Sequence, residues 1–345
     1  DTKTVTEYKT GIVSETQYTY VSSGNGIGQP LSVTMTVAGT VKHAVTYSYN
    51  AHHQIESTTE VYDGNTVRSS ISYDNLWRPE IYNSHSGLVT TNVYNDYGSI
   101  YQVKKGSSVI WEGTDVNNKG QFTGFSLGNG LITTRTYSDR GELTGINTNF
   151  KNTTTNYVQN AAYVYDPNTG NLTERNDIRN GRDEFFGYDN SDRLTSITLN
   201  GTNTYSMTYK ANGNIDTKSD VGTYGYGTNG GGPHALSKIK GYQAGVSTDK
   251  QFIEYTSFQK VSQVKQGADV NSITKTYDIY YGLDEERIKT VYTNGTAIQT
   301  RYYFGSYEKT IKADGTIEET DYIYTPSRLT CMNKTVGSVS TLYYL

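Results

Sequence analysis

The stretch Tyr137-Ser-Asp-Arg-Gly141-Glu-Leu143-Thr-Gly-Ile146 contains the pattern that decides the fold. It begins with an aromatic residue, has glycine four residues later, and has apolar residues six and nine positions after the aromatic one. Glycine preceded by short polar residues favours a tight turn, because glycine adopts positive φ without steric cost. The flanking residues are rich in Thr, Tyr, Val and Ile, which suit a pleated surface. The stretch therefore predicts a strand, a tight turn and a second strand.

The same pattern recurs along the chain, and its steps from one aromatic position to the next are 21 to 28 residues between Tyr73 and Tyr209. Val116 takes the aromatic position once, and Asp192 and Gln259 take the glycine position. The expected repeat tyrosines are Tyr49, Tyr73, Tyr94, Tyr137, Tyr165, Tyr188, Tyr209, Tyr255 and Tyr281. The expected turn glycines are Gly98, Gly120, Gly141, Gly170 and Gly213. A period of this length indicates a repeat architecture.

These units predict an all-β chain. No stretch of 12 residues shows a convincing helical apolar period, and five prolines in the whole chain suit sheets that need their N–H groups. One hairpin cannot bury its own apolar face, so neighbouring hairpins must share a core. We therefore expect repeated antiparallel hairpins in a curved or spiral sheet. Residues 1–46 are expected to form a degenerate N-terminal strand region, continuous with the repeats of residues 47–345.

Composition excludes several classes of protein. The chain has 345 residues, a formal net charge of −4, 33 tyrosines, 35 glycines and a single cysteine, Cys331. The absence of a Lys/Arg cluster argues against a nucleic-acid partner, and no apolar run is long enough for a membrane span. One cysteine excludes an internal disulfide framework and a multi-thiolate zinc site. A tyrosine-rich chain with this many aromatic rings is also not intrinsically disordered.

Candidate chemistry is sparse, and we assign no catalytic residue, metal ligand or cofactor. Adjacent carboxylates occur at Asp183-Glu184, at 284–286 and at Glu318-Glu319, but neighbours in a strand point to opposite faces and are not paired catalytic groups. His52-His53 lacks a partner at metal-ligand spacing. The repeated tyrosines are interpreted as an aromatic ladder that holds strands in register, with contact to an enclosed guest or stacking on sugars as further roles.

The repeat resembles the RHS/YD-repeat family, in which a Tyr-Asp pair opens each unit. The pair stands at Tyr62-Asp63, Tyr73-Asp74, Tyr165-Asp166, Tyr188-Asp189 and Tyr277-Asp278. Further phrases resemble family landmarks in the family's order, over roughly residues 47 to 345. They are Leu127-Gly128-Asn129-Gly130-Leu131, Tyr224-Gly-Tyr226 with Pro233-His234-Ala235-Leu236, Tyr255-Thr-Ser-Phe258, Tyr281-Gly-Leu-Asp-Glu-Glu-Arg287 and Tyr302-Tyr-Phe-Gly305.

The resemblance implies a hollow β-shell that is structural rather than enzymatic. In bacterial members of the family the shell encloses a variable C-terminal toxin used in competition or in insecticidal complexes, and in animal teneurins a similar shell belongs to an adhesion receptor. The implied partners are the remainder of the polypeptide, including a C-terminal toxin, and the implied location is secreted or at the cell surface. The family's Asp-Pro cleavage motif does not occur within these 345 residues, because Asp166-Pro167 lies inside an ordinary repeat.

Two alternatives stay open from the sequence. One is a surface adhesin, in which the curved sheet binds a glycan or a partner protein. The other is a catalytic β-structure such as a glycoside hydrolase, which needs two carboxyl groups facing each other across a cleft. Binding or hydrolysis of glycans by this chain would favour these alternatives over the shell.

Overall fold

The computed structural model describes residues 2–6, 13–151, 157–228, 231–240 and 250–345. In these ranges the regular structure is β-strand, apart from the short 3-10 helix η1 (Leu283–Glu285). Strands that follow each other in the sequence pair antiparallel, as the hairpins of the repeat require. The predicted all-β chain of antiparallel hairpins is confirmed.

The chain divides into two compact units, which are described separately. Unit 1 comprises Asp1–Ser107, Ile253–Lys265 and Thr274–Leu345, and unit 2 comprises Ser108–Phe252 and Gln266–Ile273. The boundaries after residue 252 fall within three strands, β22 (Lys250–Tyr255), β23 (Val261–Gly267) and β24 (Ile273–Tyr281).

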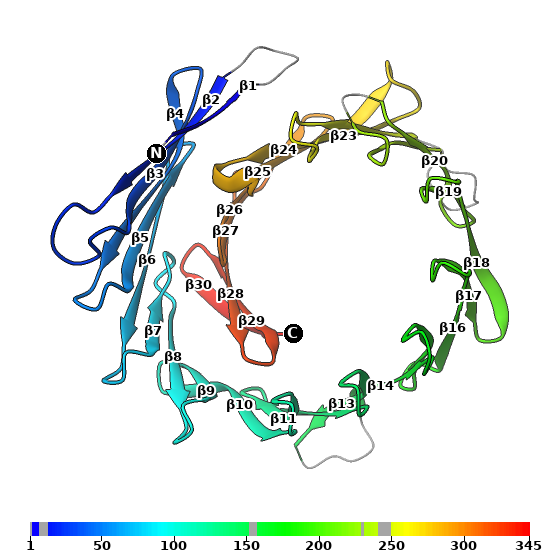
Figure 1. Ribbon diagram of the computed structural model, residues 1–345, viewed down its shortest axis with the longest axis horizontal. Coiled ribbons are helices and arrows are strands. Elements are labelled where there is room, and N and C mark those ends of the chain that lie inside the picture. The colour runs from blue at the N-terminus through cyan, green and yellow to red at the C-terminus, as the bar shows by residue number, and fades with distance from the viewer. Residues whose placement is uncertain (1, 7–12, 152–156, 229–230, 241–249) are drawn as a thin grey trace. The chain divides into compact units, whose positions relative to one another are not determined.

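Unit 1 contains the first strands of the chain and the last ones. Its N-terminal layer consists of β1 (Thr2–Thr6), β2 (Val13–Tyr20), β3 (Pro30–Val37), β4 (Thr40–Tyr49), β5 (Ile55–Tyr62), β6 (Asn65–Tyr73), β7 (Pro79–Asn83), β8 (Val89–Tyr94) and β9 (Ile100–Lys105). Its C-terminal layer continues from β24 with β25 (Arg287–Asn294), β26 (Ala297–Phe304), β27 (Tyr307–Ile311), β28 (Ile317–Thr325), β29 (Arg328–Val336) and β30 (Val339–Tyr344). Figure 1 shows the two layers beside each other.

Unit 2 is a run of hairpins that follow one another along a curved sheet (Figure 1). Its strands are β10 (Ser108–Val116), β11 (Phe122–Leu127), β12 (Leu131–Tyr137), β13 (Leu143–Phe150), β14 (Tyr157–Tyr165), β15 (Leu172–Asp177), β16 (Arg182–Tyr188), β17 (Leu194–Leu199), β18 (Thr202–Tyr209), β19 (Ile215–Lys218), β20 (Gly222–Tyr226) and β21 (Leu236–Lys240). The start of β22 pairs with β21 and ends this run.

A register shift recurs where the aromatic residue of a repeat ends its strand. In β12, for example, Thr136 pairs with Gly145, whereas Tyr137 pairs with Leu143, so one residue of β13 is left out of the ladder. An extra residue of this kind bends a strand and increases its local twist. The same shift precedes Tyr49, Tyr73, Tyr94, Tyr165, Tyr188, Tyr209 and Tyr281. It also precedes Tyr20, within the first 46 residues.

The core of unit 1 lies between its two layers. Val67 of the N-terminal layer packs with four buried residues of the C-terminal layer, and Tyr62 and Ile311 border this cluster. The four residues are Ile288, Tyr302, Phe304 and Tyr307. Burial of large apolar side chains from both layers is the main favourable free-energy contribution that holds the layers together.

Candidate functional site

The hydroxyl groups of the repeat tyrosines form one recurring contact. In seven of the expected repeat tyrosines the hydroxyl donates a hydrogen bond to a backbone carbonyl of the preceding repeat. The bonds run from Tyr49 to Pro30 (2.7 Å), Tyr73 to Ile55 (2.7 Å), Tyr94 to Pro79 (2.7 Å), Tyr137 to Phe122 (3.2 Å), Tyr188 to Leu172 (2.7 Å), Tyr209 to Leu194 (2.7 Å) and Tyr281 to Val261 (2.7 Å). The acceptor is the residue that begins the strand after the previous turn, so each ring joins its own hairpin to the one before it.

A cation from the preceding repeat covers the ring of several of these tyrosines. The guanidinium of Arg78 lies 4.0 Å from the centre of the Tyr94 ring, and Arg193 lies 4.6 Å from that of Tyr209. Lys260 occupies the same position over Tyr281, at 5.7 Å. These hydrogen bonds and cation–π contacts, the latter favourable when partly desolvated, join neighbouring repeats. The aromatic ladder expected from the sequence stays a prediction.

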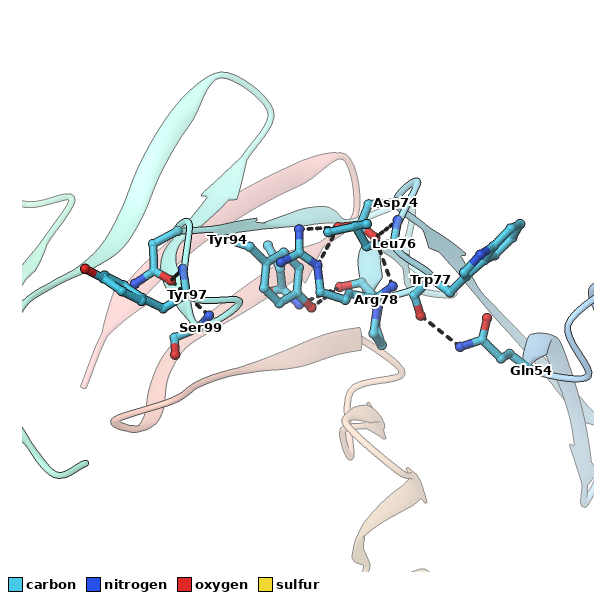
Figure 2. Close-up of polar contacts among 11 residues, drawn as sticks. Gln54, Asp74, Leu76, Trp77, Arg78, Tyr94, Tyr97 and Ser99 are labelled. Atoms are coloured by element: carbon cyan, nitrogen blue, oxygen red, sulfur yellow. Dashed lines mark hydrogen bonds and ion pairs between the residues drawn. The ribbon is translucent and has the colours of Figure 1, made fainter. Parts of the chain in front are cut away.

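The residue after the tyrosine explains the Tyr-Asp pair. The carboxylate of Asp74 accepts hydrogen bonds from the backbone N–H groups of Leu76 and Arg78 (both 2.9 Å) and also pairs with the Arg78 guanidinium (2.6 Å) (Figure 2). Asp189 makes the same contacts with its own turn. Asp and Asn side chains stabilise turns by this local bonding. In these two repeats the second residue therefore holds the turn, and the tyrosine before it ends the strand.

The glycine position of the repeat has positive φ, and it lies four residues after the aromatic residue or, for Gly170, five. The five glycines singled out from the sequence have φ of 80° (Gly98), 77° (Gly120), 93° (Gly141), 77° (Gly170) and 86° (Gly213). Asp192 and Gln259 adopt φ of 57° and 65° at this position. Trp77 also does so, with φ of 62°, although the left-handed region is unfavourable for a bulky side chain.

One repeat tyrosine, Tyr165, has other surroundings, and a further repeat tyrosine, Tyr226, was missed in the sequence. Tyr165 ends β14, where burial raises its pKa, and Tyr255 is a half-buried residue at the end of β22. Tyr226, which the sequence pattern did not assign as a repeat tyrosine, donates to the Ile215 carbonyl (2.9 Å) and lies under Lys210 (5.5 Å). Lys210 directly follows the preceding repeat tyrosine, Tyr209, whereas Arg78, Arg193 and Lys260 follow theirs by five residues, so the spacing of the cation did not identify Tyr226.

Replacement of Gly141 by valine is expected to lower the free energy of unfolding by about 1–3 kcal/mol, because valine is strained at positive φ. A Cβ at this position would meet its nearest neighbour, Gln121 Nε2, at 3.5 Å, an ordinary contact. The cost would therefore come from the backbone and not from a clash. Urea unfolding measures it, with Gly141→Asn as the matched control, because Asn tolerates this conformation. Equal stability of the valine variant and the native protein would contradict the assignment.

Replacement of Tyr209 by phenylalanine is expected to lower the free energy of unfolding by about 1 kcal/mol, the typical contribution of one hydrogen bond. The ring and its contact with Arg193 would remain, and the Leu194 carbonyl would lose its donor. Tyr324→Phe is the control, because Tyr324 is 64% exposed. Chemical denaturation of both variants compares them, and an equal loss in the two would show that the hydroxyl of Tyr209 is not part of a linking contact.

Two kinds of candidate site from the sequence, metal ligands and adjacent carboxylates, can be compared with the structure. Among the described residues, no group of three or more His, Cys, Asp or Glu side chains is placed to hold a metal ion. Of the adjacent carboxylates, Asp183 is exposed, whereas Glu184 is buried and bonded to Arg175 (2.6 Å) and Arg182 (2.9 Å). The hydrogen bond from Arg175 lowers the pKa of Glu184 despite its burial. Glu184 is thus an ionised partner in a salt bridge.

Polar contacts join the two layers of unit 1 around its core. Asp63, in the turn between β5 and β6, accepts hydrogen bonds from Lys289 Nζ (2.6 Å) and from the Tyr302 hydroxyl (2.9 Å). The bond from Lys289 is the main reason that the pKa of Asp63 lies below its ordinary value. Lys309 Nζ donates to Asn65 on the other side of the same turn (2.8 Å). The C-terminal layer therefore supplies the cations, and a turn of the N-terminal layer supplies the acceptors.

His43 uses both ring nitrogens close to the contact between the two layers of unit 1, which is called the seam below. Its Nδ1 accepts a hydrogen bond from the backbone N–H of Leu283 (2.9 Å), and its Nε2 bonds to Glu60 Oε1 (2.8 Å). A Cβ at position 282 would stand 2.2 Å from His43 Nδ1, so glycine is needed there for the two layers to approach. Because the ring is 4% exposed and both nitrogens have partners, His43 acts here as a structural link.

A buried carboxyl group completes the seam. Asp321 is 3% exposed and bonds to the Ser86 hydroxyl of the N-terminal layer. Lys105 Nζ donates to Asn333, on the strand next to Asp321 (2.7 Å). Burial raises the pKa of Asp321 above its ordinary value.

The raised pKa of Asp321 predicts a pH dependence of stability. Between the unfolded and folded pKa values the folded state binds more protons than the unfolded state, so this carboxyl group stabilises the fold at low pH and loses that contribution as pH rises. Asp321→Asn should remove the pH-dependent contribution of this carboxyl group to the free energy of unfolding. We expect the native protein to lose stability relative to the variant as pH increases above about 4. Thermal unfolding across pH measures the difference in stability, and a native protein that gains stability relative to Asp321→Asn as pH rises would contradict the prediction.

Comparisons with known proteins identify structural neighbours. No family model matches the chain, and no curated protein matches it in sequence. A chain of the Photorhabdus luminescens Tc holotoxin pore matches 97% of this chain with a TM-score of 0.66 and 14% identity. The crystal structures of TcdB2-TccC3-Cdc42 and TcdB2-TccC3-TEV match 99% and 98% of it, with TM-scores of 0.63 and 0.60 and identities of 15% and 14%.

These matches show a shared fold. The chain spans about one fifth of the length of those toxin chains, 21% or 22%. Among the residues that the structure covers, no helix is long and apolar enough to cross a bilayer. The fold is thus that of a segment of Tc toxin chains, at low sequence identity.

Proposed function

We propose that the chain is a structural, non-catalytic segment of an RHS/YD-repeat shell. The observation that carries the proposal is the recurring tyrosine contact, in which the hydroxyl group of one repeat bonds to the backbone of the preceding repeat. A unit that ties itself to its neighbour in this way extends a wall by repetition. The fold shared with chains of Tc toxins supports the same reading.

In this proposal the chain's partners are other parts of its own polypeptide. The wall encloses a C-terminal toxin, the parent protein is secreted or surface-exposed, and its use is competition between bacteria. The seam of unit 1 fits such a role, because it holds strands from opposite ends of the chain against each other through Asp63–Lys289 and His43–Leu283. A wall that surrounds a guest needs contacts of this kind, which are made between distant parts of the chain.

The coding sequence beyond Leu345 tests the proposal. We expect a core motif with an Asp-Pro phrase, followed by a short domain of unrelated composition. A reading frame that continues into membrane anchors or adhesion repeats would contradict the enclosing role and favour a surface-binding scaffold. A stop codon directly after Leu345 would also contradict it, because the enclosed cargo would then be missing.

A further inference from the structure

A cavity of about 580 Å³ lies between the two layers of unit 1. Residues of β3, β4 and β5 form one wall and residues of β24 and β25 the other, where the end of the β24–β25 hairpin lies beside the N-terminal layer (Figure 1). Tyr62 lines the cavity and also borders the core cluster. Sites for small molecules have volumes of roughly 300–1,000 Å³. The cavity is therefore large enough for a small organic molecule.

The wall of this cavity that belongs to the N-terminal layer is aliphatic. Met35 and Val37 of β3 and Val41 of β4 line it, and Tyr280 of β24 lines the opposite wall. Val41 is 58% exposed and Tyr280 44%. These residues border the space without filling it, whereas packed interiors leave few voids larger than a water molecule. A ligand that covered them would gain free energy, because it would remove apolar surface from water.

The charged residues of the cavity are two lysines, Lys42 and Lys289, and one carboxylate, Asp63. Lys289 Nζ pairs with Asp63 (2.6 Å) and lies 5.3 Å from the centre of the Tyr280 ring. Lys42 has no hydrogen-bond or ion-pair partner in the part of the chain that the structure describes. The bond from Lys289 is the main cause of the lowered pKa of Asp63, and the charge of Lys42 adds to it, so the Lys42 ammonium lies near the cavity. One positive charge is therefore left uncompensated.

An aliphatic wall beside one uncompensated cation suits an alkyl chain that ends in a single negative charge. The Met35 side chain is flexible and adapts its shape to apolar neighbours. Lys42 supplies a compact charge on a flexible stem, which pairs with a carboxylate. Phosphate groups are recognised best by the paired N–H groups of arginine, and among the described residues no arginine lines this cavity. The charge therefore favours a carboxylate over a phosphate.

We propose that this cavity, defined by Met35, Val37, Val41, Lys42 and Tyr280, binds a fatty acid. The alkyl chain lies along the aliphatic wall, and the carboxylate pairs with the Lys42 ammonium. A ligand between the two layers contacts both of them in the folded state only, so its binding also stabilises unit 1. The proposal adds a ligand site to the chain and does not depend on whether the chain forms part of a shell.

Calorimetric titration with octanoate, decanoate and dodecanoate, each below its micelle concentration, tests the proposal. Dodecylamine, which reverses the charge, and naphthoate, which replaces the chain by a planar ring, are the contrasting ligands. Lys42→Glu and Val41→Asp are the test variants, and both positions are exposed. Lys42→Arg keeps the charge, and Lys151→Glu is the matched control, because Lys151 is an exposed lysine of unit 2. Circular dichroism confirms that each variant is folded.

We expect saturable binding of one dodecanoate per chain, with an affinity that rises about fourfold for each added methylene group. Lys42→Glu and Val41→Asp should each weaken binding by about tenfold or more, because a negative charge then faces the carboxylate. Lys42→Arg and Lys151→Glu should bind as the native chain does.

Absence of saturable binding would overturn the proposal, as would unchanged binding by Lys42→Glu. Equal affinity for dodecylamine would show that the charge is not recognised, and tighter binding of naphthoate would show that the cavity selects a ring. Several dodecanoate molecules per chain without saturation would also overturn it, because the alkyl chains would then adsorb to exposed apolar surface in general.

Discussion

Phe304→Ala is expected to lower the free energy of unfolding by about 3–5 kcal/mol, the range for truncation of a buried phenylalanine. Phe304 is 5% exposed and lies in the cluster that joins the two layers of unit 1. Its ring stacks with those of Tyr302 and Tyr307, with centres 6.4 and 6.3 Å away. The substitution would leave a cavity between the layers, because the flanking strands cannot move together without breaking the bonds from Lys289 and Lys309 to the opposite turn.

Phe185→Ala is the matched control for Phe304→Ala. Phe185 belongs to β16 in unit 2 and is 44% exposed, so its truncation should cost about 1 kcal/mol or less, as for a side chain that is only partly removed from water. Differential scanning calorimetry of the two variants measures both losses. If Phe304→Ala were no more destabilising than Phe185→Ala, the two layers of unit 1 would not share a core.

Trp111→Ala should have a similarly large effect, about 3–5 kcal/mol. Trp111 of β10 and Phe125 of β11 are fully buried. The indole contacts the Phe122 ring edge to face, with centres 5.1 Å apart, and the Phe125 ring at 6.5 Å. The guanidinium of Arg135 lies over the Phe125 ring, 4.9 Å from its centre. Contacts between aromatic rings stabilise a fold beyond the burial of their surface. Truncation of Trp111 therefore removes both the burial of the indole and its contacts with the two phenylalanine rings.

Trp77→Ala makes the same chemical change at a site that is 48% exposed. We expect it to cost less than about 1 kcal/mol, in the range of surface substitutions, and to leave the far-ultraviolet circular dichroism unchanged. Urea unfolding followed by circular dichroism compares the two alanine variants. Comparable losses in the free energy of unfolding would mean that Trp111 is not part of a packed core, or that Trp77 has a larger structural role than its exposure indicates.

The local structure of the repeat was accessible from the sequence because its determinants lie within a few residues of each other. Gly141 needs only its own φ, and Asp74 bonds to backbone groups two and four residues away. The period also located the tyrosines at the ends of strands, where the register shifts. Such short-range signals are repeated many times in this chain, so single departures such as Asp192 did not hide them.

The contacts of Asp63 illustrate what the pattern did not reveal. Tyr62-Asp63 reads as a Tyr-Asp pair, but it lies in the turn from β5 to β6, where Asp63 pairs with Lys289, 226 residues away. Likewise, Tyr277 lies within β24, and the register shift comes at Tyr281. The seam depends on which distant strands meet, and no periodicity encodes this. The cations over the rings, such as Arg78 on Tyr94, were missed because the charge adjoins a turn and resembles an ordinary surface residue.

Limited proteolysis of the protein expressed from the whole reading frame tests the proposed enclosure most directly. The account predicts that the segment encoded after Leu345 resists protease while the repeats are folded, and that it is digested once Phe304→Ala and moderate urea open unit 1. The same segment expressed alone, at equal protease concentration, is the control. Digestion of the downstream segment at the same rate in the intact protein and alone would contradict the claim that the repeats enclose it.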